Sequence, residues 1–174
     1  MKITGVGSLT KHPRYDRYRS KRIAIPVLFG KVCRIVVEGY DEDPQKEEFH
    51  TAINNFLSID ESVLRACEQY VFHYYQDCNA DWDAADDEYV AVPSPSNVWD
   101  HIQLGGEPTV IRRDYGDKGI YINLGCGCDW EIEHGLQIVF KNGLKVNKVG
   151  SYDGHLTNSD AYADDSLENV VYRA

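Results

Sequence analysis

The chain has 174 residues, of which 43% are hydrophobic, and its 28 acidic and 18 basic residues give a formal net charge of -10. A chain of this length and apolar content can bury a core without a metal or a disulfide, which excludes intrinsic disorder. Its acidity disfavours nucleic acid as the main ligand, and no apolar run is long enough to span a bilayer, so we expect a soluble cytoplasmic protein without nucleic-acid or membrane contacts.

The charge is unevenly distributed along the chain. In residues 1–22 basic side chains are opposed by Asp16 alone, whereas the remainder is strongly acidic. We expect residues 1–22 to be a flexible basic leader that folds back on the acidic body, and residues 23–174 to form one domain. The alternative is a small nucleic-acid-binding arm, with Tyr15 and Tyr18 between its arginines.

Two strands are predicted directly after the leader. Apolar residues dominate 23–29, Gly30 breaks the run, and 32–37 alternates between apolar and polar residues, which is typical of a β-hairpin. Pro26 cannot donate a hydrogen bond to a neighbouring strand, so we expect an edge strand or a bulge there.

Two consecutive helices follow. Asp43 and Pro44 are favourable residues at a helix start, and the next apolar residues share one helical face. The spacing of Ser58 and Glu61 is that of a capping box, which predicts the start of a second helix. The apolar stripe of this helix predicts that it packs against the sheet; its members are Leu64, Cys67, Val71, Tyr74 and Cys78.

The segment 79–97 is rich in Asp, Ala, Pro and Ser and has no sustained periodicity, which indicates a long surface loop. We expect the indoles of Trp82 and Trp99 to anchor its two ends, with ligand binding as the alternative.

The second half of the chain returns to strand patterns. Strands are predicted at 108–113, 119–124, 136–140 and 144–149, and a last short strand at 170–172. Asn142 and Gly143 form the two-residue turn that hairpins prefer. The sequence therefore predicts an α+β fold: a mainly antiparallel sheet built from hairpins, with two consecutive helices packed on one face.

The densest group of reactive residue types lies between Cys126 and His155, and a metal site is the first interpretation. Thiolates, imidazoles and carboxylates are all present; the candidate ligands are Cys126, Cys128, His134 and Asp153. The Cys-x-Cys spacing matches no zinc motif, and both thiols continue the parity of Ile120 and Leu124, which favours a place in the core. We therefore expect no metal and no cofactor. The five cysteines lack a regular spacing, so we expect free thiols in a reducing compartment.

Acid–base catalysis is the second interpretation. Glu131 or Glu133 beside His134, and Asp153 near His155, provide candidate pairs, but the chain has no recognisable nucleophile motif. The structural alternative is that Glu133 and His134 brace the turn into the strand at 136. We assign no catalytic residue.

A binding surface is the third interpretation. Twelve tyrosines and two acidic stretches, Asp77–Glu88 and Asp153–Glu168, suit a basic protein partner that is steered by charge. An acidic surface that only maintains solubility is the alternative.

Two segments resemble those of a known family. Residues 128–136 contain W-x-x-E-H-G-L and residues 150–155 contain Y-D-G-H, and both are similar to segments of a family of small bacterial proteins of unknown function. The resemblance covers about the last third of the chain and implies no catalytic residue or cofactor. Some small acidic bacterial α+β proteins are immunity proteins that neutralise toxins, which is an analogy at the level of fold.

We therefore expect a non-enzymatic protein that binds a basic protein partner by acidic-surface occlusion, as a toxin-neutralising immunity protein would. The alternative is a metal-dependent or acid–base hydrolase centred on residues 126–155. The expected binding residues are Trp82, Asp81, Asp83, Asp86, Asp87, Trp130, Glu131, Glu133, His134, Tyr152, Asp153 and His155.

Overall fold

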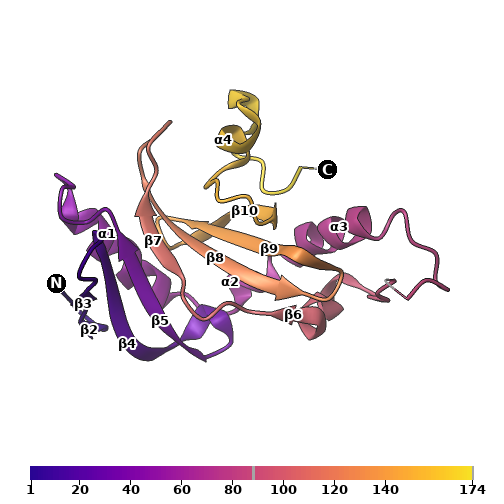
Figure 1. Cartoon of the computed structure of the whole chain (residues 1–174), viewed down its shortest axis with the longest axis horizontal. Coiled ribbons are helices and arrows are strands. Elements are labelled where there is room, and N and C mark those ends of the chain that lie inside the picture. The colour runs from indigo at the N-terminus through magenta and orange to yellow at the C-terminus, as the bar shows by residue number, and fades with distance from the viewer. Residues whose placement is uncertain (88, 174) are drawn as a thin grey trace.

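The computed structural model describes residues 1–87 and 89–173 and confirms the α+β fold (Figure 1). Its main sheet has eight strands in the order β10-β9-β8-β7-β5-β4-β3, with β6 paired to β8 at one end. All pairs are antiparallel except β5 and β7, which run parallel where Val36 lies opposite Thr109. The strands are β3 (Thr10–Lys11), β4 (Arg17–Ile25), β5 (Lys31–Glu38), β6 (Ile102–Gln103), β7 (Thr109–Arg112), β8 (Ile120–Cys128), β9 (Glu131–Lys141) and β10 (Lys145–Ser151).

Side-chain alternation divides the sheet into two faces. On one face, Ile122 of β8 and Ile138 and Phe140 of β9 belong to the main core. The alternate residues face the other way, where Tyr121 and Val139 form a second, smaller cluster with Leu156. We call this second side the open face, because the helices of the crossover between β5 and β7 pack on the first.

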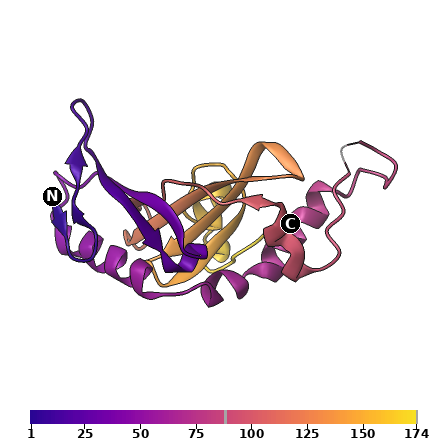
Figure 2. The same cartoon turned by 90° about the horizontal axis from the view of Figure 1, so that it is seen from below.

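The helices of this crossover lie in a row along one side of the sheet (Figure 2). They are α1 (Lys46–Ser58), α2 (Ser62–Arg65) and α3 (Glu68–Cys78). Phe49, Ile53 and Phe56 bury the apolar face of α1, and the Phe56 ring meets the Phe140 ring edge to face at a centroid distance of 5.1 Å. The predicted packing on one face is therefore confirmed.

The predicted second helix is divided in two. Cys67, with backbone angles outside the helical range, separates α2 from α3, and its thiol donates to the Leu64 carbonyl. The predicted capping box is absent from these described residues. The Ser58 hydroxyl instead donates back to the Asn55 carbonyl, and the Asp60 carboxylate accepts from the Ser62 N–H at 3.0 Å. An Asx turn at Asp60 therefore starts the second helical segment.

The basic N-terminal stretch is part of the fold. Ile3, Val6 and Leu9 are buried in the main core, next to the two-stranded sheet of β1 (Lys2–Ile3) and β2 (Gly7–Ser8). The boundary expected after residue 22 falls inside β4, which begins at Arg17. The many basic residues of this stretch obscure a strand pattern in the sequence. Buried Tyr18 and Ser20 alternate along β4 with arginines that lie on the other face.

The remaining connections refine the sequence predictions. Pro26 ends β4 and begins the 3-10 helix η1 (Pro26–Leu28), so the first predicted strand stops four residues earlier than expected. Residues 170–172 form no strand, although the Val149 N–H donates to the Val171 carbonyl at 2.7 Å. Three short helices complete the described chain: η2 (Pro95–His101), α4 (Asn158–Tyr162) and η3 (Asp165–Leu167). Over the residues described, each helix is too short or too polar to cross a bilayer.

Candidate functional site

A cavity of about 810 Å³ opens on the open face of the sheet. Thr109 and Ile111 of β7 and Asn123 of β8 line it from the sheet side, because they alternate with core residues. The turn between β7 and β8 forms one wall, and the segment 154–168, which contains α4 and η3, forms another. Its size is that of a ligand site in proteins generally.

Arg113 holds these two walls together. The guanidinium is 3% exposed, and its Nε and Nη2 donate to the two carboxylate oxygens of Asp160 at 2.7 Å each. Its Nη1 and Nη2 donate to the carboxylate oxygens of Glu168 at 2.6 and 2.9 Å. These hydrogen bonds raise the pKa of Arg113 above its usual range. The two carboxylates therefore fix the C-terminal segment against the end of β7.

In the Y-D-G-H segment, Asp153 stabilises a turn, whereas Tyr152 and His155 line the cavity. The Asp153 carboxylate accepts from the His155 N–H at 2.8 Å and from the ammonium of Lys148, which is only 2% exposed. Burial lowers the pKa of Lys148, and the Asp153 carboxylate opposes that shift. Gly154 has φ +81°, so it turns the chain. Tyr152 and His155 consequently line the cavity, while Asp153 anchors the turn that presents them.

The W-x-x-E-H-G-L segment lies elsewhere, on the hairpin between β8 and β9. Trp130 is 6% exposed and packs edge to face against Tyr75 at a centroid distance of 5.7 Å, so it is a core residue. Gly135 has φ +70°, and a Cβ there would lie 2.3 Å from the Cys126 carbonyl oxygen. Most of this motif therefore builds the hairpin.

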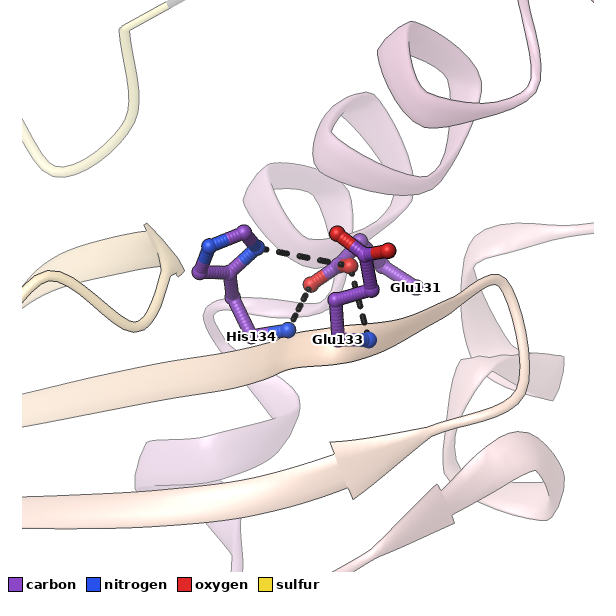
Figure 3. A group of neighbouring side chains, drawn as sticks. All are labelled: Glu131, Glu133 and His134. Atoms are coloured by element: carbon purple, nitrogen blue, oxygen red, sulfur yellow. Dashed lines mark hydrogen bonds and ion pairs between the residues drawn. The ribbon is translucent and has the colours of Figure 1, made fainter.

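Among the described residues, one group of side chains has its potential ligand atoms close enough together to hold a metal ion. Its members are Glu131, Glu133 and His134 (Figure 3). The Glu131 carboxylate accepts from the backbone N–H groups of residues 133, 134 and 135 at 3.0, 2.8 and 2.7 Å. Glu131 rather than Glu133 therefore braces the turn. Because both of its oxygens are already hydrogen-bonded and the other two side chains are exposed, the group fits a turn brace better than a metal centre.

The candidate metal ligands Cys126 and Cys128 face the helices. Both are buried in the main core, as their parity predicts. Burial raises the pKa of each thiol to about 12, so both are protonated at neutral pH. His134 is exposed and Asp153 is bonded to Lys148, so the four candidate ligands do not converge.

The acidic segment 81–87 is fully exposed and extends beyond the end of α3, away from the sheet (Figures 1 and 2). Trp82 is 42% exposed, so it does not anchor the loop. Trp99 does, because its indole N–H donates to Glu68 at 2.7 Å. The Asp86 carboxylate accepts from the Asp83 N–H, whereas Asp81, Asp83 and Asp87 form no ion pair with a described residue. Glu88, the last residue of the predicted acidic stretch, lies outside the described residues.

Most carboxylates of the second acidic stretch, Asp153–Glu168, form ion pairs or hydrogen bonds within the fold. Asp160 and Glu168 bind Arg113, Asp153 binds Lys148, and Asp164 accepts from the Ser166 N–H. Among the carboxylates of this stretch, Asp164 and Asp165 are exposed and form no ion pair with a described residue. The two stretches are therefore different kinds of surface.

The structure thus brings Tyr152 and His155 together with Arg113 and Asn123, which the sequence did not single out, and with Asp160 and Glu168, which it named only as part of an acidic stretch. The two segments that carry these residues lie far apart along the chain and meet at the cavity. The available signal was an arginine doublet at the end of a predicted strand, in a chain whose C-terminal carboxylates lack nearby bases. That signal does not identify which carboxylates the arginines bind.

The fold and the cavity define an α+β protein with a hollow, lined by charged and apolar residues, on the open face of a mainly antiparallel sheet. The chain belongs to the family described as Domain of unknown function (DUF6985), whose model matches residues 5–156. The match begins within the stretch expected to be a leader and ends at Leu156, before α4. Comparisons with curated proteins and with solved structures gave no match.

Proposed function

We propose that the chain is a non-enzymatic binding protein that recognises a basic protein partner through the acidic segment 81–87. The observation that carries the proposal is the combination of an exposed indole, Trp82, with three exposed carboxylates that have no described cationic partner, those of Asp81, Asp83 and Asp87. Tryptophan supplies apolar contact area, and the unpaired carboxylates attract a basic surface and orient it during encounter.

The mode of action that this surface suits is occlusion. A projecting segment that carries negative charge and an aromatic anchor can cover a basic active site, as a toxin-neutralising protein does. The five free cysteines suit a reducing cytoplasm. A hydrolase site at residues 126–155 has less support. The thiols of this segment face the core, and the imidazoles of His134 and His155 lie on separate turns.

The test is affinity capture from the native lysate by immobilised full-length protein, with quantitative mass spectrometry. The test variant carries Asp81→Lys, Asp83→Lys and Asp87→Lys, which leaves the internal bond of Asp86 intact. A matched variant carries Glu42→Lys, Glu47→Lys and Glu61→Lys, which are exposed carboxylates on the helical side.

We expect the wild type and the matched variant to retain one basic protein near equimolar ratio, and the loop variant to lose it. High salt should release the partner, since exposed charges are screened. Equal retention by the loop variant, or a partner without basic character, would contradict the proposal.

A further inference from the structure

The cavity on the open face contains no residue of the acidic segment, and the proposed function leaves it without a role. We infer that it is a second binding site, which takes a lysine or arginine side chain of the basic partner. This inference rests on the proposed function and adds the anchor point that the partner uses.

The charge of the cavity supports a cationic occupant. Its lining holds five carboxylates, those of Glu38, Asp114, Asp160, Asp165 and Glu168, against the guanidiniums of Arg17, Arg112 and Arg113.

Each of these guanidiniums already has a carboxylate partner. Arg113 binds Asp160 and Glu168 as described. Arg17 Nε lies within ion-pair distance, 3.1 Å, of a Glu38 oxygen, although it forms no hydrogen bond to a described residue. Arg112 binds Asp43 and Glu48, which belong to the helical side of the sheet. An anionic ligand that binds Arg112 or Arg113 would therefore have to displace internal ion pairs, whereas a cation would not.

Two carboxylates at the rim remain available. Asp114 in the turn after β7 and Asp165 at the start of η3 are exposed and form no ion pair with a described residue. They belong to the two walls that Arg113 holds together, so an ammonium or guanidinium group that enters the cavity meets negative charge from each wall.

The rest of the lining suits the stem of a long basic side chain. Ile111 and Leu156 offer apolar surface, and the exposed rings of Tyr115 and Tyr152 can pack against methylene groups or against a cation. Ser159 is 6% exposed, and no described residue hydrogen-bonds to its hydroxyl, which leaves a polar group inside the cavity for a ligand.

The experiment is a titration of the isotope-labelled full-length chain, followed by amide chemical shifts. The probe is the blocked tripeptide acetyl-Lys-Lys-Lys-amide. The comparison ligands are acetyl-Glu-Glu-Glu-amide and 1,4-diaminobutane, which is a free diamine. We expect the lysine peptide alone to shift the amides of residues 111–116 and 152–159, with the glutamate peptide inactive and the diamine weaker.

A variant with Asp114→Asn and Asp165→Asn should bind the lysine peptide about three- to tenfold more weakly. A matched variant with Glu42→Gln and Glu61→Gln should bind it as the wild type does. Unchanged affinity in the first variant, or shifts confined to residues 81–87, would overturn the cavity inference; the latter result would leave the proposed function standing. Equal binding of the diamine would identify a free amine as the ligand and overturn the assignment to a partner side chain. Failure of the proposed function itself appears separately, as loss of salt-sensitive capture.

Discussion

Arg113 and Asp160 are separated by 47 residues, yet two guanidinium nitrogens of Arg113 donate to the two carboxylate oxygens of Asp160. This bidentate pair connects the end of β7 to α4 and gives the open face its second wall. The cavity therefore depends on a single buried arginine.

Replacing Arg113 with alanine should destabilise the protein by about 3–5 kcal/mol, because the carboxylates of Asp160 and Glu168 would lose their shared cation while partly buried. Hydrogen exchange of residues 158–168 should accelerate in the same variant. Denaturant unfolding measures the first effect. The control is Arg19→Ala, which breaks an exposed pair with Glu107 and should cost about 0–1 kcal/mol. Equal losses in the two variants would refute the structural role of Arg113.

Because of Asp43, the free energy of unfolding should decrease as the pH falls in the acidic range. Hydrogen bonds from Arg112 lower the pKa of the Asp43 carboxyl below its ordinary value of 3.8. The stabilisation is therefore complete above about pH 5, where the carboxyl is ionised in the unfolded state as well, and is lost as the pH falls through 3.8 toward the lower pKa of the folded state. Asp43→Asn should lower the stability at neutral pH by about 1–3 kcal/mol and should lose less on acidification than the wild type. Unfolding free energies at about pH 7 and about pH 3 test this, with Glu42→Gln as the control. Parallel pH profiles for wild type and Asp43→Asn would be inconsistent with the pair.

Alanine substitutions at Gly135 and Gly154, one glycine from each motif, should differ in their effect on stability. Both have positive φ, but a Cβ at residue 135 would lie 2.3 Å from a backbone oxygen, whereas a Cβ at residue 154 has nothing within 4 Å. Gly154→Ala should cost about 1–2 kcal/mol from backbone strain alone. Gly135→Ala should cost about 3 kcal/mol or more, since backbone atoms of β8 must also move. Thermal unfolding of both variants compares them, and a reversed order would be evidence against the hairpin geometry.

Glu131 and Glu133 should behave differently on neutralisation. Glu131→Gln weakens three hydrogen bonds from backbone N–H groups and should destabilise the protein by about 1–3 kcal/mol, whereas Glu133→Gln should stay within about 0.5 kcal/mol of the wild type. Added zinc should leave both melting temperatures unchanged. Stabilisation by zinc that disappears in Glu133→Gln would instead identify a metal site.

Local patterns predicted much of the fold. Alternation placed Ile120, Ile122 and Leu124 in the core, and the same parity extended correctly to Cys126 and Cys128. Asn142 and Gly143 predicted the position of the turn between β9 and β10, although three residues, 142–144, connect the two strands instead of the expected two. These successes rest on interactions between residues that are close in sequence, because side-chain period and turn chemistry are local properties.

Features that depend on distant contacts were not predictable. The basic residues near the N-terminus obscured the strand pattern of β4, which is stabilised by pairing to β5 and by ion pairs such as Arg17 with Glu38. The cavity requires Arg113 to meet Asp160 and Glu168, and no local pattern contains that information. Asp153 was expected to bind a ligand, yet its neighbour is the buried Lys148.

The central claim, recognition of a basic partner by the acidic segment 81–87, is tested most directly by association kinetics with the captured protein over a range of salt concentrations. The account predicts that the wild-type association rate falls steeply with ionic strength, and that reversal of Asp81, Asp83 and Asp87 slows association at low salt on the order of tenfold and removes most of the salt dependence. Association rates that are the same for both proteins, and independent of salt, would contradict the claim.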